Sequence, residues 1–423
     1  MNGKILFGTL LACSVLIGAD AETEPSTAEY IFSRRSAIDY ALLHNLELEA
    51  ARTVLARAQA QSIDAGRLSN PELGFRGKSD FLDGGVGEHN LEIGIAQRFP
   101  VTDRLSRERE VAAIEIELAQ IEIEMGELQL AAETAEVYFT VQAQIAKRQL
   151  EEERLELTQR LADFLETRVL AAEASPLETK RLRMEEFQIG QELADLEIAE
   201  DQSRARLADL LGLPAGQEFT LNEILYDQIL EPLPPLAEDW LTKHPAYRYR
   251  ALGVDLASEQ ISLARAGRWG DVGVELFFES KYEGDNASTL ERENLVGLGV
   301  GIPLPILQQN RGKIEASRAD RREAALRLEA IRQRLHREAR LQAETAHHAR
   351  EHLKVYTEGV SELMEESLSE VEMAYAQGQI DFDALLRLRE QTLEIRQHQI
   401  ELHLEYANAR IQWAAATGQL ELL

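Results

Sequence analysis

Residues 347–352 carry the side chains best suited to catalysis in this chain. The segment "HHAREH" places His348, Glu351 and His352 in the spacing H-x-x-E-H. Two imidazoles one helical turn apart can share a zinc ion, and a nearby carboxylate can act as a base. However, the segment lies within a long charged stretch that offers no third ligand. We therefore interpret it as a solvated helix face, able at most to contact a metal adventitiously, and we expect no metal site and no cofactor.

The glycine-rich segment 297–303, "GLGVGIP", is a second candidate for chemistry. Its G-x-G spacing lies inside an alternating, strand-like pattern and is followed by proline. No helix N-terminus follows that could hold a phosphate. The sequence also contains no G-x-S-x-G motif and no nucleotide-binding loop. We therefore predict that the protein is not an enzyme and that these small residues line one face of a strand.

Acidic residues gather around two predicted helix ends. Gly378 can end one helix and Asp381 can cap the next, while Ser175 and Pro176 suit the same role earlier in the chain. The nearby acids are Glu173, Glu178, Glu370, Glu372, Asp381 and Asp383, and the bases that could pair with them are Lys180, Arg181, Arg387 and Arg389. Ordinary capping and a solvated end would explain each of these residues equally well.

The segment 113–130, "AIEIELAQIEIEMGELQL", indicates which kind of secondary structure the predicted turns connect. It alternates like a strand, but the alternation restarts every seven residues, so we predict a helix. On a helix Ile114, Ile121 and Met125 fall on one flank, and Ile116 and Ile123 fall on the opposite flank. Two apolar flanks fit a helix that has neighbours on both sides, either as a stave of a hollow helical barrel or in a layered bundle.

Charge and the N-terminus narrow the class of protein. The net charge of -29 disfavours a nucleic-acid partner, because phosphates would be repelled. Residues 1–21 read as an export signal with cleavage at Ala19-Asp20-Ala21. The alternative, a lipoprotein signal at Cys13, has the large Leu11 at a position that favours small residues. Cys13 is the only cysteine, so we expect a mature chain without disulfides.

The chain repeats itself with an offset of about 200 residues. "HNLELEAARTVLARAQAQSIDAGR" matches "HPAYRYRALGVDLASEQISLARAGR", and "IGIAQRFPV" matches "VGIPLPI". The proline-free intervals after Pro100 and Pro305 predict long helices, the first over about 102–174. We divide the chain into a signal (1–21), an N-terminal segment (22–35), a first repeat (36–214), a connector (215–235), a second repeat (236–418) and a tail (419–423).

Each repeat contains two alternating segments that predict strands. They lie at about 71–81 and 89–100 in the first repeat, and at about 271–281 and 293–304 in the second. Their length of about ten residues would cross a membrane at a tilt. Four strands cannot close a membrane barrel, and an open edge in lipid leaves backbone groups unsatisfied. Either several chains close the barrel, or the strands form two soluble hairpins packed on helices.

Motifs across the mature chain resemble the TolC family of outer-membrane efflux ducts, in particular its heavy-metal branch. They are "ALLHNLELEAA", "LSNPELGF", "AQRFPVTDRLSRERE", "GIPLPILQQNRGKIEASRA" and "AYAQGQIDFDALLRLREQ". The resemblance marks the strand-to-helix junctions at Pro100, Pro303, Pro305, Asn310, Arg311 and Gly312. One departure is Gly270, which stands where proline usually precedes the strand.

The resemblance implies a mainly α-helical fold with a small β part, built from two repeats of helix, β-hairpin, long helix and helix. It implies a homotrimer with a twelve-stranded barrel in the outer membrane and an α-helical barrel in the periplasm. Such a duct conducts passively and works with an inner-membrane pump through a periplasmic adaptor. The tip and adaptor-docking residues would be Glu173, Ser175, Pro176, Gly378, Asp381 and Asp383, with Lys180, Arg181, Arg387 and Arg389 as clamps. A non-pore periplasmic coiled-coil scaffold or adaptor is the alternative, and the cargo stays unassigned.

Overall fold

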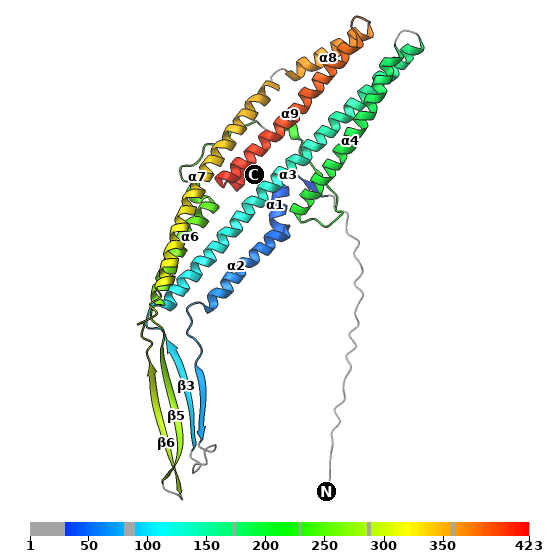
Figure 1. Cartoon of the computed structure of the whole chain (residues 1–423). Coiled ribbons are helices and arrows are strands. Elements are labelled where there is room, and N and C mark those ends of the chain that lie inside the picture. Colours follow the sequence, from blue (N-terminus) through cyan, green and yellow to red (C-terminus); the bar gives the residue numbers. More distant parts are fainter. Residues whose placement is uncertain are drawn as a thin grey trace, which may run out of the picture.

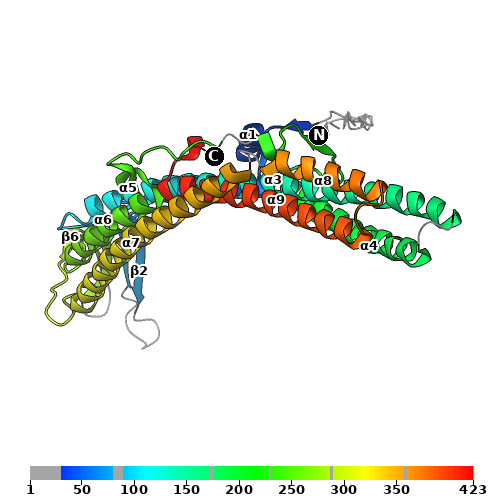
Figure 2. The ribbon, with the colours of Figure 1, turned by 90° about the horizontal axis from the view of Figure 1, so that it is seen from above.

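The computed structural model describes residues 30–79, 89–171, 175–227, 230–285, 289–356 and 360–422. Long helices run side by side and continue at one end into a four-stranded sheet (Figure 1). Seen from above, the helices form one curved band (Figure 2). The predicted cleavage residues Ala19 and Ala21 and the acidic residue Glu173 lie outside the described residues.

The first repeat is built around one very long helix. Strand β1 (Tyr30–Phe32) precedes α1 (Arg34–His44) and α2 (Leu46–Asp64), and after the first hairpin come α3 (Arg104–Leu170) and α4 (Pro176–Leu211). Helix α3 has 67 residues, which corresponds to about 100 Å of length. Its length agrees with the proline-free interval from which it was predicted.

The second repeat has the same order, and the structure describes its long helix in two parts, α7 and α8. It contains α5 (Trp240–Lys243), α6 (Pro245–Ala266), α7 (Arg311–Val355), α8 (Ser361–Ala376) and α9 (Phe382–Thr417), and the chain closes with η4 (Leu420–Leu422). A single long helix was expected where α7 and α8 stand. Residues 357–359 between them lie outside the described residues, and Tyr356 and Val360 on either side keep right-handed helical backbone angles.

The connector between the repeats pairs with the N-terminal segment. Strand β4 (Phe219–Leu221) runs parallel to β1, and the short helix η2 (Leu225–Asp227) follows it. The three-residue runs "YIF" and "FTL" are too short to show a period, so the sequence did not predict this small sheet. Phe32 and Phe219 are buried in the main core, beside Tyr138 of α3 and Trp413 of α9.

In both repeats a capping side chain joins the start of one helix to the end of another. Asn45 caps α2, and its Nδ2 donates a hydrogen bond to the Leu210 carbonyl (3.0 Å) at the end of α4. His244 caps α6, and its Nε2 contacts the Ala415 carbonyl (3.2 Å) at the end of α9. In each repeat the side chain that caps one helix therefore also contacts a backbone carbonyl group near the end of another helix.

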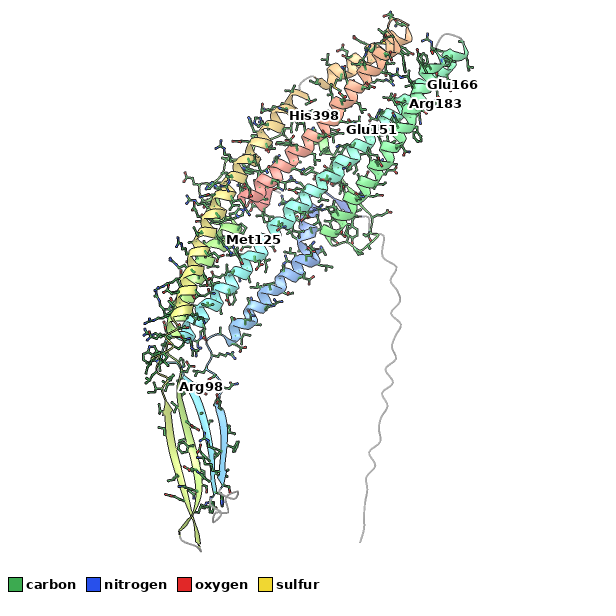
Figure 3. The ribbon with its side chains drawn as sticks, in the orientation of Figure 1. Arg98, Met125, Glu151, Glu166, Arg183 and His398 are labelled. Atoms are coloured by element: carbon green, nitrogen blue, oxygen red, sulfur yellow. The ribbon has the colours of Figure 1, made fainter. Side chains whose placement is uncertain are left out.

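Helix α3 has a partner on both sides, as its two apolar flanks predict. Arg52 of α2 pairs with Glu127 (3.0 Å), and Arg248 of α6 pairs with Glu124 (2.6 Å). Leu48 of α2 lies against Gly126, whereas Met125, in the part of α3 nearer the sheet (Figure 3), lines a cavity shared with the start of α6. Among the described residues no helix combines the length and apolar character needed to span a bilayer.

The four long strands form one antiparallel sheet in the order β2-β3-β5-β6. Their bounds are Glu72–Ser79, His89–Phe99, Val272–Asp285 and Thr289–Gly301. The second hairpin is longer than expected, since pairing continues to Asp285 and Thr289, within a segment read as loop. Strand β6 also stops three residues early, at Gly301, because Pro303 and Pro305 cannot donate hydrogen bonds to a sheet.

Candidate functional site

The two helix turns farthest from the sheet have the caps that their sequences predict. Ser175 caps α4 and accepts a hydrogen bond from the Leu177 amide (3.2 Å), with Pro176 in the first turn. Asp381 caps α9 and accepts from the Ala384 amide (2.8 Å). Gly378 adopts a φ of 73°, a left-handed conformation that favours glycine. The starts of α4 and α9 are therefore fixed by local capping.

Ion pairs join the elements around these turns. Arg181 of α4 pairs with Asp383 of α9 (2.9 Å), although both side chains are exposed. Arg389 pairs with Glu372 of α8 (2.7 Å) and is four-fifths buried. Lys180 and Arg387 are exposed and form no ion pair within the described part of the chain. Two of the four candidate clamps thus meet an acid of the predicted cluster.

Arg183 is a charged hub that the sequence reading did not single out. It reaches Asp163 (2.9 Å) and Glu166 (3.2 Å) of α3 and also Glu186 (2.8 Å) of its own helix (Figure 3). Beneath these charges, Leu161, Leu165 and Leu182 share a small core with Tyr375, Phe382 and Leu385. Burial raises the pKa of the Tyr375 hydroxyl, and Glu178 adds to the shift. The helix ends that border the two turns therefore share one hydrophobic core.

The sheet has two chemically different faces. Cross-strand pairing aligns Leu73, Ile95, Leu276 and Leu298 in one row and Phe75, Ile93, Phe278 and Val296 in the next. These side chains are all exposed, from 39% to 74%. The opposite face carries glycines and charged residues, including Glu72, Arg76, Glu92, Glu275 and Glu279. One face thus suits hydrocarbon and the other suits water.

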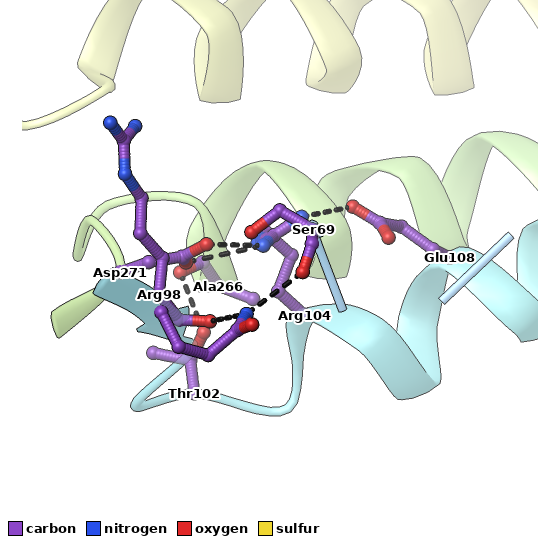
Figure 4. A network of polar contacts seen from close by, with 8 residues as sticks. Ser69, Arg98, Thr102, Arg104, Glu108, Ala266 and Asp271 are labelled. Carbon is purple, nitrogen blue, oxygen red and sulfur yellow. Dashed lines mark hydrogen bonds and ion pairs between the residues drawn. The ribbon is translucent and has the colours of Figure 1, made fainter. Parts of the chain in front are cut away.

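A polar network ties the sheet to the helices (Figure 4). Arg104, at the start of α3, forms two hydrogen bonds with the carboxylate of Asp271 (2.8 and 3.1 Å) and pairs with Glu108 (2.6 Å). The Thr102 hydroxyl donates to the Ala266 carbonyl (3.0 Å). These contacts cross from the first repeat to the second. The sequence did not predict these contacts. Its signal was limited to an arginine shortly after β3 and an aspartate directly before β5.

The predicted junction residues surround this network. Pro100 follows β3, and Pro303 and Pro305 follow β6. Asn310 precedes α7 with a φ of 57°, and its Nδ2 donates to the Ala264 carbonyl (2.6 Å). Arg311 and Gly312 open α7, and Arg311 donates to the Gln309 side chain (3.0 Å).

Gly270 leaves space that the junction uses. A Cβ atom at that position would lie 2.8 Å from Cγ of Pro303. Gly270, which stands where proline was expected, therefore leaves room for the ring of Pro303 after β6.

The histidine segment lies on the outside of α7. His347, His348, Glu351 and His352 are exposed, and Glu351 pairs with Lys354 (2.7 Å) and Arg350 (3.2 Å). Within the residues that the structure describes, no three His, Cys, Asp or Glu side chains converge to hold a metal. The segment has the geometry of a solvated helix face.

These features have counterparts among known proteins. The family model described as "Outer membrane efflux protein" matches residues 37–213 and 236–419, which are most of the chain. The chain belongs to this family. It is thus an outer membrane efflux protein, and its fold is mainly helical.

Individual relatives agree with this assignment. The chain is 23% identical over 294 residues to the cobalt-zinc-cadmium resistance protein CzcC of Cupriavidus metallidurans, covering 69% of this chain and 67% of that protein. Its structure is similar to that of CusC, with a TM-score of 0.75 at 17% identity and 91% of each chain covered. It is also similar to the open outer membrane channel MtrE of Neisseria gonorrhoeae, with a TM-score of 0.73, 17% identity and coverage of 92% and 89%.

Proposed function

We propose that three copies of this efflux protein form one continuous exit duct. The observation that carries this proposal is the sheet, which exposes an entire apolar face and ends in two open edges. Within the described residues, β2 and β6 each pair on one side only. An open edge is not tolerated in hydrocarbon, whereas three four-stranded sheets joined edge to edge make a twelve-stranded barrel without edges.

The helices offer surfaces for the same assembly. Helix α4 lies at one edge of the helical band and α7 and α8 at the other (Figure 1). Helix α4 exposes the apolar stripe Leu177, Met184, Phe187 and Ile198, and the other edge exposes Leu341, Val355, Leu363 and Met373. Leu177, Met184 and Ile198 follow heptad spacing, which is typical of helices that pack against further helices. The curvature of the band in Figure 2 fits the wall of a tube.

The proposed duct works without chemistry of its own. A periplasmic adaptor would dock at the end formed by Ser175, Pro176, Gly378, Asp381 and Asp383, and an inner-membrane pump would supply the energy. Arg181–Asp383 and Arg389–Glu372 would hold that end in its closed form. Carboxylates along the passage would favour cationic cargo, which agrees with the metal resistance for which CzcC is named.

A pair of neighbouring substitutions tests the membrane barrel. Leu276 and Glu275 are adjacent in β5 and lie on opposite faces. An arginine on the lipid face of a barrel costs about 2–4 kcal/mol at the bilayer midplane. We therefore expect Leu276→Arg to lower the yield of heat-sensitive trimer in the membrane fraction, whereas Glu275→Arg should assemble. Equal yields, or a wild-type protein recovered as a soluble monomer, would instead favour the periplasmic scaffold.

A further inference from the structure

The charged face of the sheet contains one unusual row. Cross-strand pairing aligns Gly74, Gly94, Phe277 and Gly297, one residue from each strand. Three of the four positions have no side chain, and the fourth is a large aromatic ring. Glycine weakens a strand, and inside one it often marks a place where another group approaches closely.

The Phe277 side chain occupies the space that these glycines leave. A Cβ atom added at Gly297 would lie 2.2 Å from Cζ of the Phe277 ring and 2.6 Å from its Cε2. A Cβ atom added at Gly94 would lie 3.2 Å from Cβ of Phe277. Contacts under 3.0 Å are not tolerated, so the ring lies flat across β6 only because residue 297 is glycine.

This face lines the passage in the proposed barrel, and the inference rests on that proposed function. We propose that Gly297 is a positioning residue for the passage: it leaves a space, called the seat here, in which the Phe277 ring lies flat against β6 and does not narrow the barrel at this level. Three rings, one per chain, would lie at one level of the wall. A ring that is displaced from β6 has to turn either toward Gly94 or toward the axis of the barrel. The Glu275 side chain already lies beside Gly94, with its Oε1 3.3 Å from the position of an added Cβ atom, so we expect the ring to turn toward the axis.

The seat can be removed while a matched glycine serves as control. Gly297→Ala forces the ring off β6. Gly299 lies on the same face of the same strand, and a Cβ atom added there would lie 3.7 Å from Cβ of Glu275, an ordinary contact. Gly299→Ala therefore makes the same chemical change and the same change in strand propensity, without moving the ring.

A cysteine reporter measures passage past the ring independently of the closed helical end. Gly301 lies beyond the row on the helix side, and a Cβ atom there meets nothing within 4 Å. In the Gly301→Cys background, bulky methanethiosulfonate reagents are added from the hairpin side, and the rate of modification is measured on assembled trimers. We expect Gly297→Ala to slow modification relative to Gly299→Ala. Combining Gly297→Ala with Phe277→Ala should restore the rate.

Each result decides the proposal. Equal rates in the two alanine variants, or slow modification that persists without the Phe277 ring, would overturn the role of Phe277 while leaving the duct intact. If the reporter in the otherwise unchanged chain is not modified from the hairpin side, the face does not line a passage, and the proposed function fails with it. Should Gly297→Ala not assemble, recovery of trimer in the double variant Gly297→Ala with Phe277→Ala would support the contact between residue 297 and the ring. Failure of that double variant to assemble would overturn it.

Discussion

At the scale of single residues, His403 is buried in α9 without a charged neighbour that would favour its protonation. Its Nδ1 has no hydrogen-bond partner among the described residues, and the ring meets Tyr226 edge-on at 5.2 Å. Burial lowers the pKa of His403 to about 4. The folded chain thus holds this imidazole neutral over a range in which an exposed histidine would bind a proton.

This shift predicts a loss of stability in acid. The unfolded chain takes up the proton near pH 6.5 and the folded chain only near pH 4. The stabilisation is complete above pH 6.5 and falls by about 1.4 kcal/mol per pH unit below it, to a loss of roughly 3 kcal/mol. Thermal melts followed by helical circular dichroism at pH 7 and pH 4.5 should show this fall in wild type and a weaker one in His403→Gln. His398→Gln, at an exposed site of the same helix, should keep the full slope; a slope that His403→Gln does not change would refute the assignment.

His244 should add to the same dependence. Burial lowers its pKa, and its neutral Nδ1 accepts the hydrogen bond from the Ala246 amide that caps α6 (3.1 Å). Protonation would remove this acceptor. The dependence of stability on pH that remains in His403→Gln should therefore become weaker when His244 is also changed to Asn. Asparagine keeps the helix cap, as Asn45 does for α2, but does not take up a proton in this range. No further fall in the double variant would show that the His244 cap does not contribute to acid sensitivity.

The Arg104–Asp271 contact predicts energetic coupling between the repeats. Its side chains are about three-quarters buried and meet in two parallel hydrogen bonds. A double-mutant cycle with alanine should give a coupling of about 1–2 kcal/mol. The exposed pair Arg340–Glu344 serves as the control and should give less than about 0.5 kcal/mol. Equal coupling for both pairs would mean that the junction is not held by this contact.

At the scale of elements, the heptad pattern of α3 predicts that both of its flanks are needed. Ile121 is buried, and Ile123 packs against the main core. Replacing either with Asp buries a charge without a partner, which costs several kcal/mol. Ile121→Asp and Ile123→Asp should each reduce assembled trimer, measured on unheated gels, whereas Glu122→Gln at the exposed position between them should not. Harm from only one of the two would show that α3 has a single essential flank.

Periodic elements were predictable and local exceptions were not. The length of α3 and the alternating strands followed from patterns long enough to average out single residues, as at Ile114 to Leu130. The small sheet of β1 and β4 did not, because its three-residue strands are too short to show a period. The turn caps at Ser175 and Asp381 were readable since capping is local. The Arg104–Asp271 contact was not, because its partners are 167 residues apart and meet only when two repeats align.

At the scale of the whole molecule, the net charge of -29 predicts a passage that prefers cations. The acids near the two helix turns would lie where the proposed tube narrows, and three chains would triple their number at each level. Changing Asp381 and Asp383 to Asn should weaken the cation preference in planar bilayers, and it should raise conductance because Arg181 loses its partner. Asp195→Asn with Asp201→Asn removes equal charge from exposed sites on α4 and should change neither. A larger loss of cation preference in the Asp195 and Asp201 variant than in the Asp381 and Asp383 variant would show that the selective charge lies elsewhere.

Single-channel recording of the purified full-length protein shows whether three chains make one continuous passage. The trimeric fraction should give discrete conductance steps of uniform size. Under a salt gradient it should also give a reversal potential of the sign for cation preference. Inserted protein that gives no steps, steps that come from the monomeric fraction, or a reversal potential of the opposite sign would contradict the proposed duct.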